Sequence, residues 1–258
     1  MKLPMMIAAL SFLGIATAFA KIHTETVEYK HGDVVLEGYL AFDDAGDAVR
    51  PGVLIVHEWT GVGDYVKARA RQLAELGYVA FALDMYGKGV RPQNSQEASA
   101  QAKIYRSDRS LMRARAAAGL EQLKKYPLVD PGKVAAIGYC FGGGTVLELA
   151  RSGAEIAGVV SFHGNLDTPN LQDAKNIKAK ILVCHGGSDP NVPPEQVQAF
   201  EQEMTAAGVD WEMNIYGHAV HAFTNPASGN DPSRGAAYNE KADRRSWQAM
   251  LDFFKEIF

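Results

Sequence analysis

Short apolar runs alternate with amphipathic segments along most of this chain. The runs 52–56, 79–83, 156–162 and 180–184 are almost wholly apolar, as expected of parallel strands that are buried on both faces. Further strands are predicted over residues 24–29, 34–42 and 211–216 and in the apolar run that starts at Val134 and stops at Gly138; the first two form an edge hairpin. Helices are predicted over residues 64–76, 92–105, 108–125, 143–151, 194–207 and 238–257. This alternation predicts an α/β fold, in which helices cover both faces of a mostly parallel central sheet.

The first 20 residues have a different pattern. Lys2 precedes an almost uncharged apolar run over residues 5–18, and Ala18-Phe19-Ala20 has the small-residue spacing of a signal-peptidase site. We therefore expect residues 1–20 to be a secretory signal peptide, cleaved after Ala20, and the mature protein to be secreted, to a bacterial periplasm. An uncleaved membrane anchor fits less well, because the run is short and ends in small residues.

Composition narrows the classes of partner. The chain has 258 residues, of which 47% are hydrophobic, so residues 21–258 can bury a large core and are expected to form one domain. The net charge is −4 and no basic stripe is present, which argues against nucleic acid as a partner. No later segment is long enough to span a bilayer, so no stable membrane insertion is expected after signal cleavage. The expected partner is a small molecule, and a monomer is the favoured state.

The segment with the most specific chemistry is Gly138-Tyr139-Cys140-Phe141-Gly142. It joins an apolar strand to a helix, which is the setting of a G-x-nucleophile-x-G elbow, here with Cys140 as the nucleophile. The two glycines are expected because a Cβ at either position would meet neighbouring backbone. The helix that follows directs its positive dipole end at the thiol, which favours a thiolate and later an oxyanion. The alternative is an inert buried cysteine beside packing glycines.

The second cysteine, Cys184, ends the predicted strand 180–184. An exported protein could pair it with Cys140 in a disulfide. The strand 156–162 is expected to lie between the two cysteines, which separates them by roughly 9–10 Å and puts them beyond disulfide reach. Cys184 is therefore predicted to be a small core hydrophobe.

A carboxylate that could orient an imidazole follows the strand 180–184. Asp189 stands in this strand-end loop before Pro190, where it could instead be a turn residue or a helix cap. Asp167 and Asp210 are rivals, but neither follows a strand end so directly. Asp189 is therefore the predicted acid.

Two histidines compete as the general base in the loop after the last strand, His218 and His221. The chain order nucleophile, acid, histidine is that of the α/β-hydrolases. We select His221, because His-x-Phe is the usual setting at this loop, and expect His218 at the surface. The other histidines more often satisfy loop hydrogen bonds than act in catalysis; they are His23, His31, His57, His163 and His185. No spacing of His, Cys and Asp predicts a metal site.

Glu58 follows the strand 52–56, in a loop that, in an α/β-hydrolase, supplies an oxyanion donor. Its carboxylate could accept the thiol proton when substrate arrives. Alternatively, it could be a supporting residue or the ion-pair partner of an arginine such as Arg69.

Taken together, these motifs resemble the dienelactone hydrolase family from about residue 25 to the end of the chain. The matching segments are His57-Glu58-Trp59, Leu76-Gly-Tyr-Val-Ala80, Asp84-Met-Tyr-Gly87, Gly138-Tyr-Cys-Phe-Gly-Gly143, Asp189-Pro190 and His221-Ala-Phe223. The resemblance implies an α/β-hydrolase fold and hydrolysis of small esters or lactones without a cofactor. It implies a Cys140–His221–Asp189 triad, with Glu58 taking the thiol proton. It also implies that the amides of Trp59 and Phe141 form the oxyanion hole.

The substrate-binding positions depart from the family pattern. Enzymes that act on dienelactone hold its carboxylate with two arginines, and the corresponding positions here carry Lys88 and Asn225. Lys88 could bind a carboxylate as a point charge, whereas Asn225 cannot replace a charge. Tyr86 and Phe223 are expected to wall the pocket together with Trp59 and Phe141, which favours a small or medium acyl group.

Two other functions remain open at this stage. A thiol sensor would use Cys140 reversibly, but no resolving cysteine lies nearby in the sequence. A hydrolase-fold binding protein without ester turnover would not need an intact Cys, Asp and His set. Ester turnover by the purified protein distinguishes the three functions.

Overall fold

A computed structural model describes residues 21–258, and the signal peptide predicted over residues 1–20 lies outside this range. Eight strands form one sheet in the order β1-β2-β4-β3-β5-β6-β7-β8. The strands are β1 Ile22–His31, β2 Val34–Asp43, β3 Arg50–Val56, β4 Val79–Leu83, β5 Val129–Tyr139, β6 Gly158–Phe162, β7 Lys180–Gly186 and β8 Trp211–Tyr216. β1 and β2 are antiparallel, and β3 to β8 run parallel to one another. The predicted edge hairpin and mostly parallel sheet are thus confirmed.

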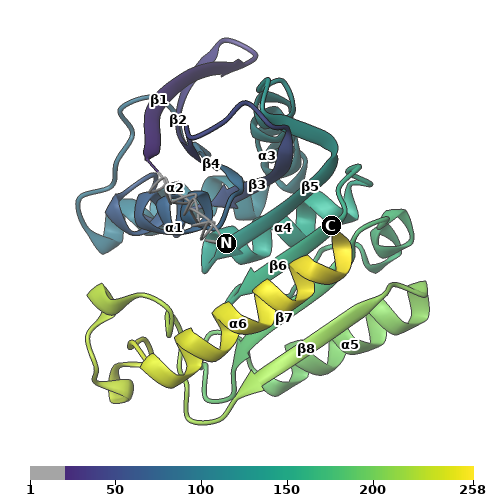
Figure 1. The fold of residues 1–258 in the computed structure, drawn as a ribbon. Helices are drawn as coiled ribbons and strands as arrows, with labels where there is room; N and C mark the ends of the chain where they lie inside the picture. The colour runs from purple at the N-terminus through teal and green to yellow at the C-terminus, as the bar shows by residue number, and fades with distance from the viewer. Residues whose placement is uncertain (1–20) are drawn as a thin grey trace, which may run out of the picture.

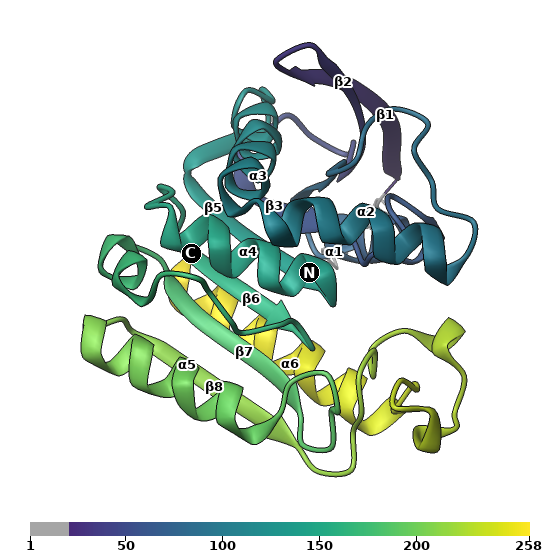
Figure 2. The ribbon, with the colours of Figure 1, turned by 180° about the vertical axis from the view of Figure 1, so that it is seen from behind.

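Six α-helices cover the sheet on both faces, as predicted (Figures 1 and 2). They are α1 Asp64–Glu75, α2 Ser95–Ser107, α3 Arg109–Lys124, α4 Phe141–Arg151, α5 Pro194–Ala207 and α6 Glu240–Ile257. Helices α1 and α6 pack on one face, which Figure 1 shows in front. Helices α2, α3, α4 and α5 cover the other face, seen in Figure 2. Three short 3-10 helices are also present: η1 Leu171–Asn176, η2 Pro226–Ser228 and η3 Pro232–Arg234.

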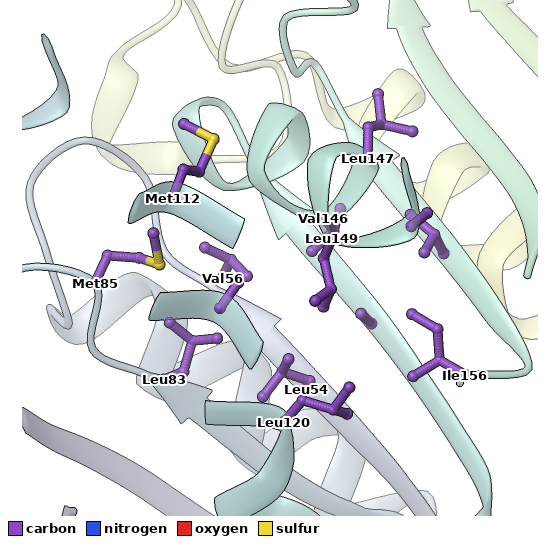
Figure 3. Close-up of a cluster of buried hydrophobic side chains, with 14 of the residues drawn as sticks. Leu54, Val56, Leu83, Met85, Met112, Leu120, Val146, Leu147, Leu149 and Ile156 are labelled. Carbon is purple, nitrogen blue, oxygen red and sulfur yellow. The ribbon is translucent and has the colours of Figure 1, made fainter. Parts of the chain in front are cut away.

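The sheet has a hydrophobic core on each face, and its apolar strands supply side chains to both cores. Successive side chains of a strand point to opposite faces, so a strand such as β3 supplies Leu54 and Val56 to one core and Val53 and Ile55 to the other. Figure 3 shows Leu54 and Val56 in the cluster beneath α4, where Val146 also packs. Burial on both faces holds the carboxyl ends of the parallel strands in place. The loops that carry the candidate site residues start from these strand ends.

Helix boundaries differ from the predicted ones by a few residues because capping side chains set them. Asn94, Asp108 and Asn239 each accept a backbone N–H from the first turn of α2, α3 and α6, so these helices begin just after the cap. The predicted helix 143–151 starts earlier, at Phe141, immediately after the elbow.

The predicted separation of the two cysteines is confirmed. β6 lies between β5 and β7, and both Cys140 and Cys184 are free thiols. Cys184 is fully buried, and burial raises the pKa of its thiol to about 12, although the Tyr216 hydroxyl opposes that rise. This inert thiol fits its predicted role as a core residue. Within residues 21–258, no helix has the length and apolar character needed to cross a membrane.

Candidate active site

The elbow places Cys140 on a strained turn between β5 and α4. Cys140 has φ 55° and ψ −116°, a conformation rarely adopted by a residue with a side chain. A Cβ on Gly138 would lie 2.1 Å from the Gly142 carbonyl oxygen, and one on Gly142 would lie 2.2 Å from the Val56 carbonyl oxygen. Both glycines therefore allow the backbone to fold tightly enough to lift the thiol clear of the sheet.

Cys140, His221 and Asp189 come together from three strand ends. The His221 Nε2 atom lies 3.0 Å from the Cys140 Sγ, and its Nδ1 lies 2.8 Å from Asp189 Oδ2. The other carboxylate oxygen of Asp189 accepts the Asn191 backbone N–H over 2.8 Å, which holds the acid in its turn. The backbone of His221 donates to the Gly235 carbonyl and accepts from the Ala237 N–H. The imidazole is thus positioned by its main chain as well as by the acid.

The charges around His221 favour its protonated form. Burial lowers the pKa of this imidazole, but the adjacent Cys140 sulfur and the Asp189 carboxylate outweigh burial and raise it to about 10. A histidine that keeps its proton beside a sulfur atom at 3.0 Å can form a thiolate–imidazolium pair. In such a pair the thiol proton already resides on His221, and Asp189 stabilises the resulting imidazolium.

Glu58 lines the cleft that Cys140 and His221 also line, and its hydrogen-bond partner is Asn225. The Asn225 Oδ1 accepts the Ala227 backbone N–H, so the amide orients its Nδ2 toward Glu58 Oε2, to which it donates over 2.7 Å. Burial raises the pKa of Glu58, against the smaller opposing effects of Asn225, His221 and Arg69. Glu58 therefore holds a proton more readily than an exposed glutamate does.

The alternative in which Glu58 forms an ion pair with Arg69 is wrong. The Arg69 guanidinium pairs with Asp243 at the start of α6 and donates to the Thr224 carbonyl. It also donates to the Tyr65 hydroxyl over 3.2 Å. Arg69 thereby ties α1 to α6 beneath the cleft, and Glu58 is left with a neutral amide as its hydrogen-bond donor.

Of the two predicted oxyanion donors, Phe141 directly follows Cys140 in the chain, and Trp59 lines the same cleft as Cys140. Phe141 is the first residue of α4, and Trp59 follows Glu58 in the loop after β3. No acceptor for either backbone N–H is found within residues 21–258, so both amides are available to a ligand. The dipole of α4 adds positive potential at the same point.

Three aromatic residues predicted to wall the pocket lie behind it instead. Tyr86, Phe141 and Phe223 are almost fully buried and do not line the cleft. The Tyr86 hydroxyl donates to the Trp59 carbonyl over 2.9 Å, and its ring packs against Phe141. Phe223 packs edge-to-face on His163. These side chains support the loops that reach the cleft, because the strand ends turn them toward the core.

The role expected of Lys88 does not fit its position. Its ammonium is exposed, pairs with Glu28 on β1 and lies outside the cleft. The turn after β4 directs Lys88 toward the hairpin, and its backbone N–H donates to the Val35 carbonyl. Lys88 is therefore corrected from a substrate-binding residue to a surface ion pair.

A cleft of about 860 Å³ opens at the carboxyl ends of the strands, and Cys140, His221, Glu58, Trp59 and Asn225 line it. Sequence patterns did not indicate the other polar residues on its walls, which come from separate loops and helices. These include Asp64, Tyr65, Arg106, Asn165, Asn191, Ser228 and Arg234. Their sequence separation explains why no local motif could predict them.

His163, expected to satisfy loop hydrogen bonds rather than act in catalysis, does make such bonds. It is fully buried directly beneath the nucleophile, where its Nδ1 accepts the Cys140 backbone N–H over 3.1 Å. Its Nε2 lies 2.7 Å from the Thr224 hydroxyl, which in turn lies 2.6 Å from the Tyr65 hydroxyl on the cleft wall. Burial, followed by the charge of His221, keeps the pKa of His163 well below its ordinary value. A neutral imidazole thus supports the strained elbow.

The rival residues lie elsewhere. Asp167 pairs with Arg109, and Asp210 pairs with Lys180. His218 is exposed in the loop after β8 and does not line the cleft. Across residues 21–258, no group of three or more His, Cys, Asp or Glu side chains has the arrangement of a metal site.

Comparison with known proteins agrees with this geometry. The family model described as "Dienelactone hydrolase family" matches residues 36–258. The crystal structure of a "dienelactone hydrolase-like promiscuous phosphotriesterase" from metagenomic libraries is 41% identical, with a TM-score of 0.88, covering 92% of this chain and 99% of that one. A structure called "m3DLH" is 39% identical over the same shares of the two chains, also with a TM-score of 0.88.

A curated relative, "Uncharacterized protein K02A2.1" of Caenorhabditis elegans, is 39% identical over an alignment of 160 residues that covers 59% of this chain and 98% of that protein. These likenesses confirm the α/β-hydrolase fold. Because the family model covers most of the chain, from β2 to the end of α6, this protein belongs to the dienelactone hydrolase family of hydrolases.

Proposed function

We propose that this protein hydrolyses small carboxylic esters or lactones through a thioester on Cys140. The observation that carries the proposal is the pair of contacts at His221, 3.0 Å to Cys140 Sγ and 2.8 Å to Asp189 Oδ2, on the wall of the cleft. A nucleophile, a base and an orienting acid in contact supply the groups that acyl transfer requires. The reaction needs no cofactor.

In the acylation step, the Cys140 thiolate attacks the carbonyl carbon, and a C–S bond forms as the carbonyl oxygen becomes an oxyanion. The amides of Trp59 and Phe141 donate hydrogen bonds to that oxyanion. The oxyanion collapses, the C–O bond breaks, and His221 gives its proton to the departing alkoxide. The products of this step are an alcohol and a thioester.

In the deacylation step, neutral His221 removes a proton from water as the water attacks the thioester carbonyl. The C–S bond then breaks, Cys140 leaves as a thiolate, and the carboxylic acid departs. Asp189 holds the imidazole in the tautomer that this step requires and stabilises it when it becomes charged.

The two cysteines provide a matched test of the nucleophile. Cys140→Ala should lower kcat for a 4-nitrophenyl ester by about 10³-fold or more, because the covalent route is lost. Cys184→Ala should keep most of the activity and cost about 1 kcal/mol of stability, because it removes one small core side chain. Mass spectrometry with a slow ester should find the acyl group on Cys140. If Cys184→Ala is the inactive variant, the proposal is wrong.

The two histidines provide a test of the base. His221→Ala should accumulate the acyl-enzyme, because deacylation loses the group that activates water. His218→Ala should retain activity within about twofold, as expected of an exposed residue away from the cleft. Equal and severe losses in both variants would contradict the assignment of His221.

A second candidate function is hydrolysis of phosphotriesters, because the metagenomic relative named for that activity is 41% identical over nearly its whole length. The same thiolate could attack phosphorus and displace an aryl oxide, with the two amides facing the phosphoryl oxygen. Turnover of paraoxon, measured beside the 4-nitrophenyl ester, tests this. Turnover that disappears in Cys140→Ala would support it, and no turnover in a protein that is active on esters would exclude it.

Ester turnover also separates the proposal from a thiol sensor and from a binding protein. A sensor would show reversible oxidation of Cys140 without turnover, and a binding protein would show affinity without turnover. Multiple turnovers of one ester by the purified wild-type protein exclude both alternatives.

A further inference from the structure

Two buried side chains behind the nucleophile have no part in the proposed mechanism so far, His57 and Tyr86. We propose that both are positioning residues, which hold the Trp59 backbone N–H in the direction of the developing oxyanion. Neither side chain lines the cleft, so both act through the peptide groups on either side of the Trp59 Cα. This inference rests on the proposed ester hydrolysis and adds two residues to its mechanism.

His57 directly follows β3 and is fully buried, and both of its ring nitrogens have backbone partners. The Met85 N–H donates to Nε2 over 3.2 Å, so Nε2 is the unprotonated nitrogen of the ring. The proton of the neutral ring is therefore on Nδ1, which donates to the Glu58 carbonyl oxygen at 2.5 Å. Burial lowers the pKa of His57, against the opposing effect of that hydrogen bond, and so favours the neutral ring that these partners require.

The Glu58 carbonyl and the Trp59 N–H belong to one peptide unit. The peptide bonds of the described residues are trans, so the C=O and the N–H of this unit point in opposite directions. His57 holds the carbonyl oxygen, which also accepts the Gly61 N–H over 3.3 Å. The Trp59 N–H therefore points away from the buried His57 ring, and within residues 21–258 it has no acceptor. Since Trp59 and Cys140 line the same cleft, this N–H is free for an oxygen bound there.

Tyr86 holds the next peptide unit along the chain. Its hydroxyl donates to the Trp59 carbonyl oxygen over 2.9 Å. The peptide units before and after the Trp59 Cα are thus each fixed by a buried side chain. The N–H cannot turn without breaking a hydrogen bond in the interior, where a lost partner costs more free energy than it does in water.

The same two rings contact Phe141, whose N–H is the second predicted oxyanion donor. The His57 ring stacks on Phe141 with the centroids 6.1 Å apart, and the Tyr86 centroid lies 5.8 Å from that of Phe141. His57 and Tyr86 meet edge-to-face at 4.9 Å. One buried cluster therefore supports both donors, although they come from separate strand ends. Donors that are already oriented stabilise an oxyanion without reorganising during the reaction.

The test starts from a matched pair of variants, His57→Leu and His57→Asn. Leu and Asn are similar in size and shape, and both lose the Nε2 acceptor of the Met85 N–H. Only Asn keeps an N–H donor near the position of Nδ1, where it can reach the Glu58 carbonyl. The pair therefore isolates the hydrogen bond that orients the peptide unit.

Tyr86→Phe removes the donor to the Trp59 carbonyl and keeps the packing of the ring. Its control is Tyr105→Phe. The Tyr105 ring stacks on Tyr86 with the centroids 5.6 Å apart, but within the described residues its hydroxyl donates to neither peptide unit.

Three measurements distinguish the oxyanion hole from the elbow, all in the Cys184→Ala background. Hydrolysis of 4-nitrophenyl acetate develops an oxyanion. The inhibition constant of a trifluoromethyl ketone reports the same charge without turnover, because the Cys140 thiolate adds to its carbonyl carbon and leaves the oxygen negative. Alkylation of Cys140 by iodoacetamide forms a C–S bond and releases iodide, so it develops no oxyanion.

Removal of a whole oxyanion donor lowers kcat by about 10²- to 10³-fold, so a misdirected donor should cost less than this. We expect His57→Leu to lower kcat/KM for the ester by about 30-fold and Tyr86→Phe by about three- to tenfold. The inhibition constant of the ketone should rise by similar factors, and the rate of alkylation should stay within about twofold of wild type. His57→Asn should keep kcat/KM within about fivefold of wild type, and Tyr105→Phe should change none of the three quantities.

Equal losses in His57→Leu and His57→Asn would overturn the inference, because the hydrogen bond to the Glu58 carbonyl would then have no effect. Parallel losses of ester hydrolysis and alkylation would also overturn it, because they would show damage to the elbow. Tyr86→Phe decides the matter if His57→Leu does not fold, and wild-type hydrolysis and ketone inhibition in that variant would overturn the inference. All these outcomes leave ester hydrolysis by Cys140 intact, whereas a wild-type protein without Cys140-dependent turnover would overturn both proposals.

Discussion

At the residue scale, the central question is which group takes the proton of the Cys140 thiol. The raised pKa of His221, about 10, arises because the neighbouring sulfur and Asp189 together outweigh the effect of burial. This rise in pKa favours the charged imidazole. With a charged imidazole at this position, Glu58, whose pKa burial raises, is not needed as the group that takes the thiol proton. The resemblance implied that Glu58 takes the thiol proton, whereas this balance of charges favours His221.

Alkylation of Cys140 by iodoacetamide tests which group takes the proton. Glu58→Gln should react within about threefold of wild type near pH 7, because His221 still holds the proton and the new amide oxygen can still accept from Asn225. His221→Asn should react about tenfold more slowly or worse near pH 7 and recover as the pH rises past the ordinary thiol range. Slow alkylation in Glu58→Gln alone would show that the glutamate is the base. Cys184→Ala serves as the background, so that only Cys140 is measured.

At the element scale, the site depends on how closely the elbow approaches its neighbouring strand. Gly142 at the start of α4 lies against the main chain of β3, and Gly138 lies against Gly142. His163, in the loop after β6, supports the same turn from below through the Cys140 N–H. The ends of β3, β5 and β6 thus meet at the elbow. Their contacts hold Cys140 in its strained conformation.

Gly142→Ala tests this close approach. Its Cβ would lie 2.2 Å from the Val56 carbonyl oxygen and 2.7 Å from that of His57, so one of the two elements must move. We expect a loss of about 2–4 kcal/mol in the free energy of unfolding, measured by urea denaturation, together with a large loss of activity.

Gly217→Ala is the control, because nothing lies within 4 Å of a Cβ there and its φ lies outside the left-handed region. It should change the free energy of unfolding by less than about 1 kcal/mol. An unchanged urea midpoint in Gly142→Ala would show that the elbow tolerates a side chain and that the packing argument is wrong.

At the scale of the whole molecule, every group proposed for catalysis comes from the carboxyl end of a parallel strand. β3 leads to Glu58, β5 to Cys140, β7 to Asp189 and β8 to His221. The parallel strands place these ends along one edge of the sheet, and the loops there form the cleft. The predicted signal peptide precedes β1, and we propose that it directs this domain out of the cytoplasm.

Export is tested on the protein made in a bacterial host. N-terminal sequencing or intact mass of periplasmic material should begin at Lys21, because Ala18-Phe19-Ala20 has the small-residue pattern that signal peptidase cleaves. Replacing Ala20 by a bulky residue, as in Ala20→Trp, should block cleavage and leave the uncut precursor. A wild-type protein that keeps Met1 and remains in the cytoplasm would contradict the prediction.

The sequence by itself determined much of this fold and the principal candidates of its site. Fully apolar strands that alternate with amphipathic helices favour a parallel sheet covered by helices, so the fold class and the succession of elements along the chain were readable from the pattern. The elbow was readable because its chemistry is local: Gly138, Cys140 and Gly142 lie within five residues. Asp189 and His221 were found because strand ends carry functional loops.

Tertiary structure decided what depends on side-chain direction and on distant neighbours. Lys88 turned out to face Glu28, and Tyr86 and Phe223 lie behind the cleft, because a strand end can direct a side chain to either side. The pairing of Glu58 with Asn225 joins residues 167 positions apart, and Arg106 and Arg234 meet the cleft from opposite halves of the chain. No local pattern encodes such contacts, since they exist only after the loops have packed together.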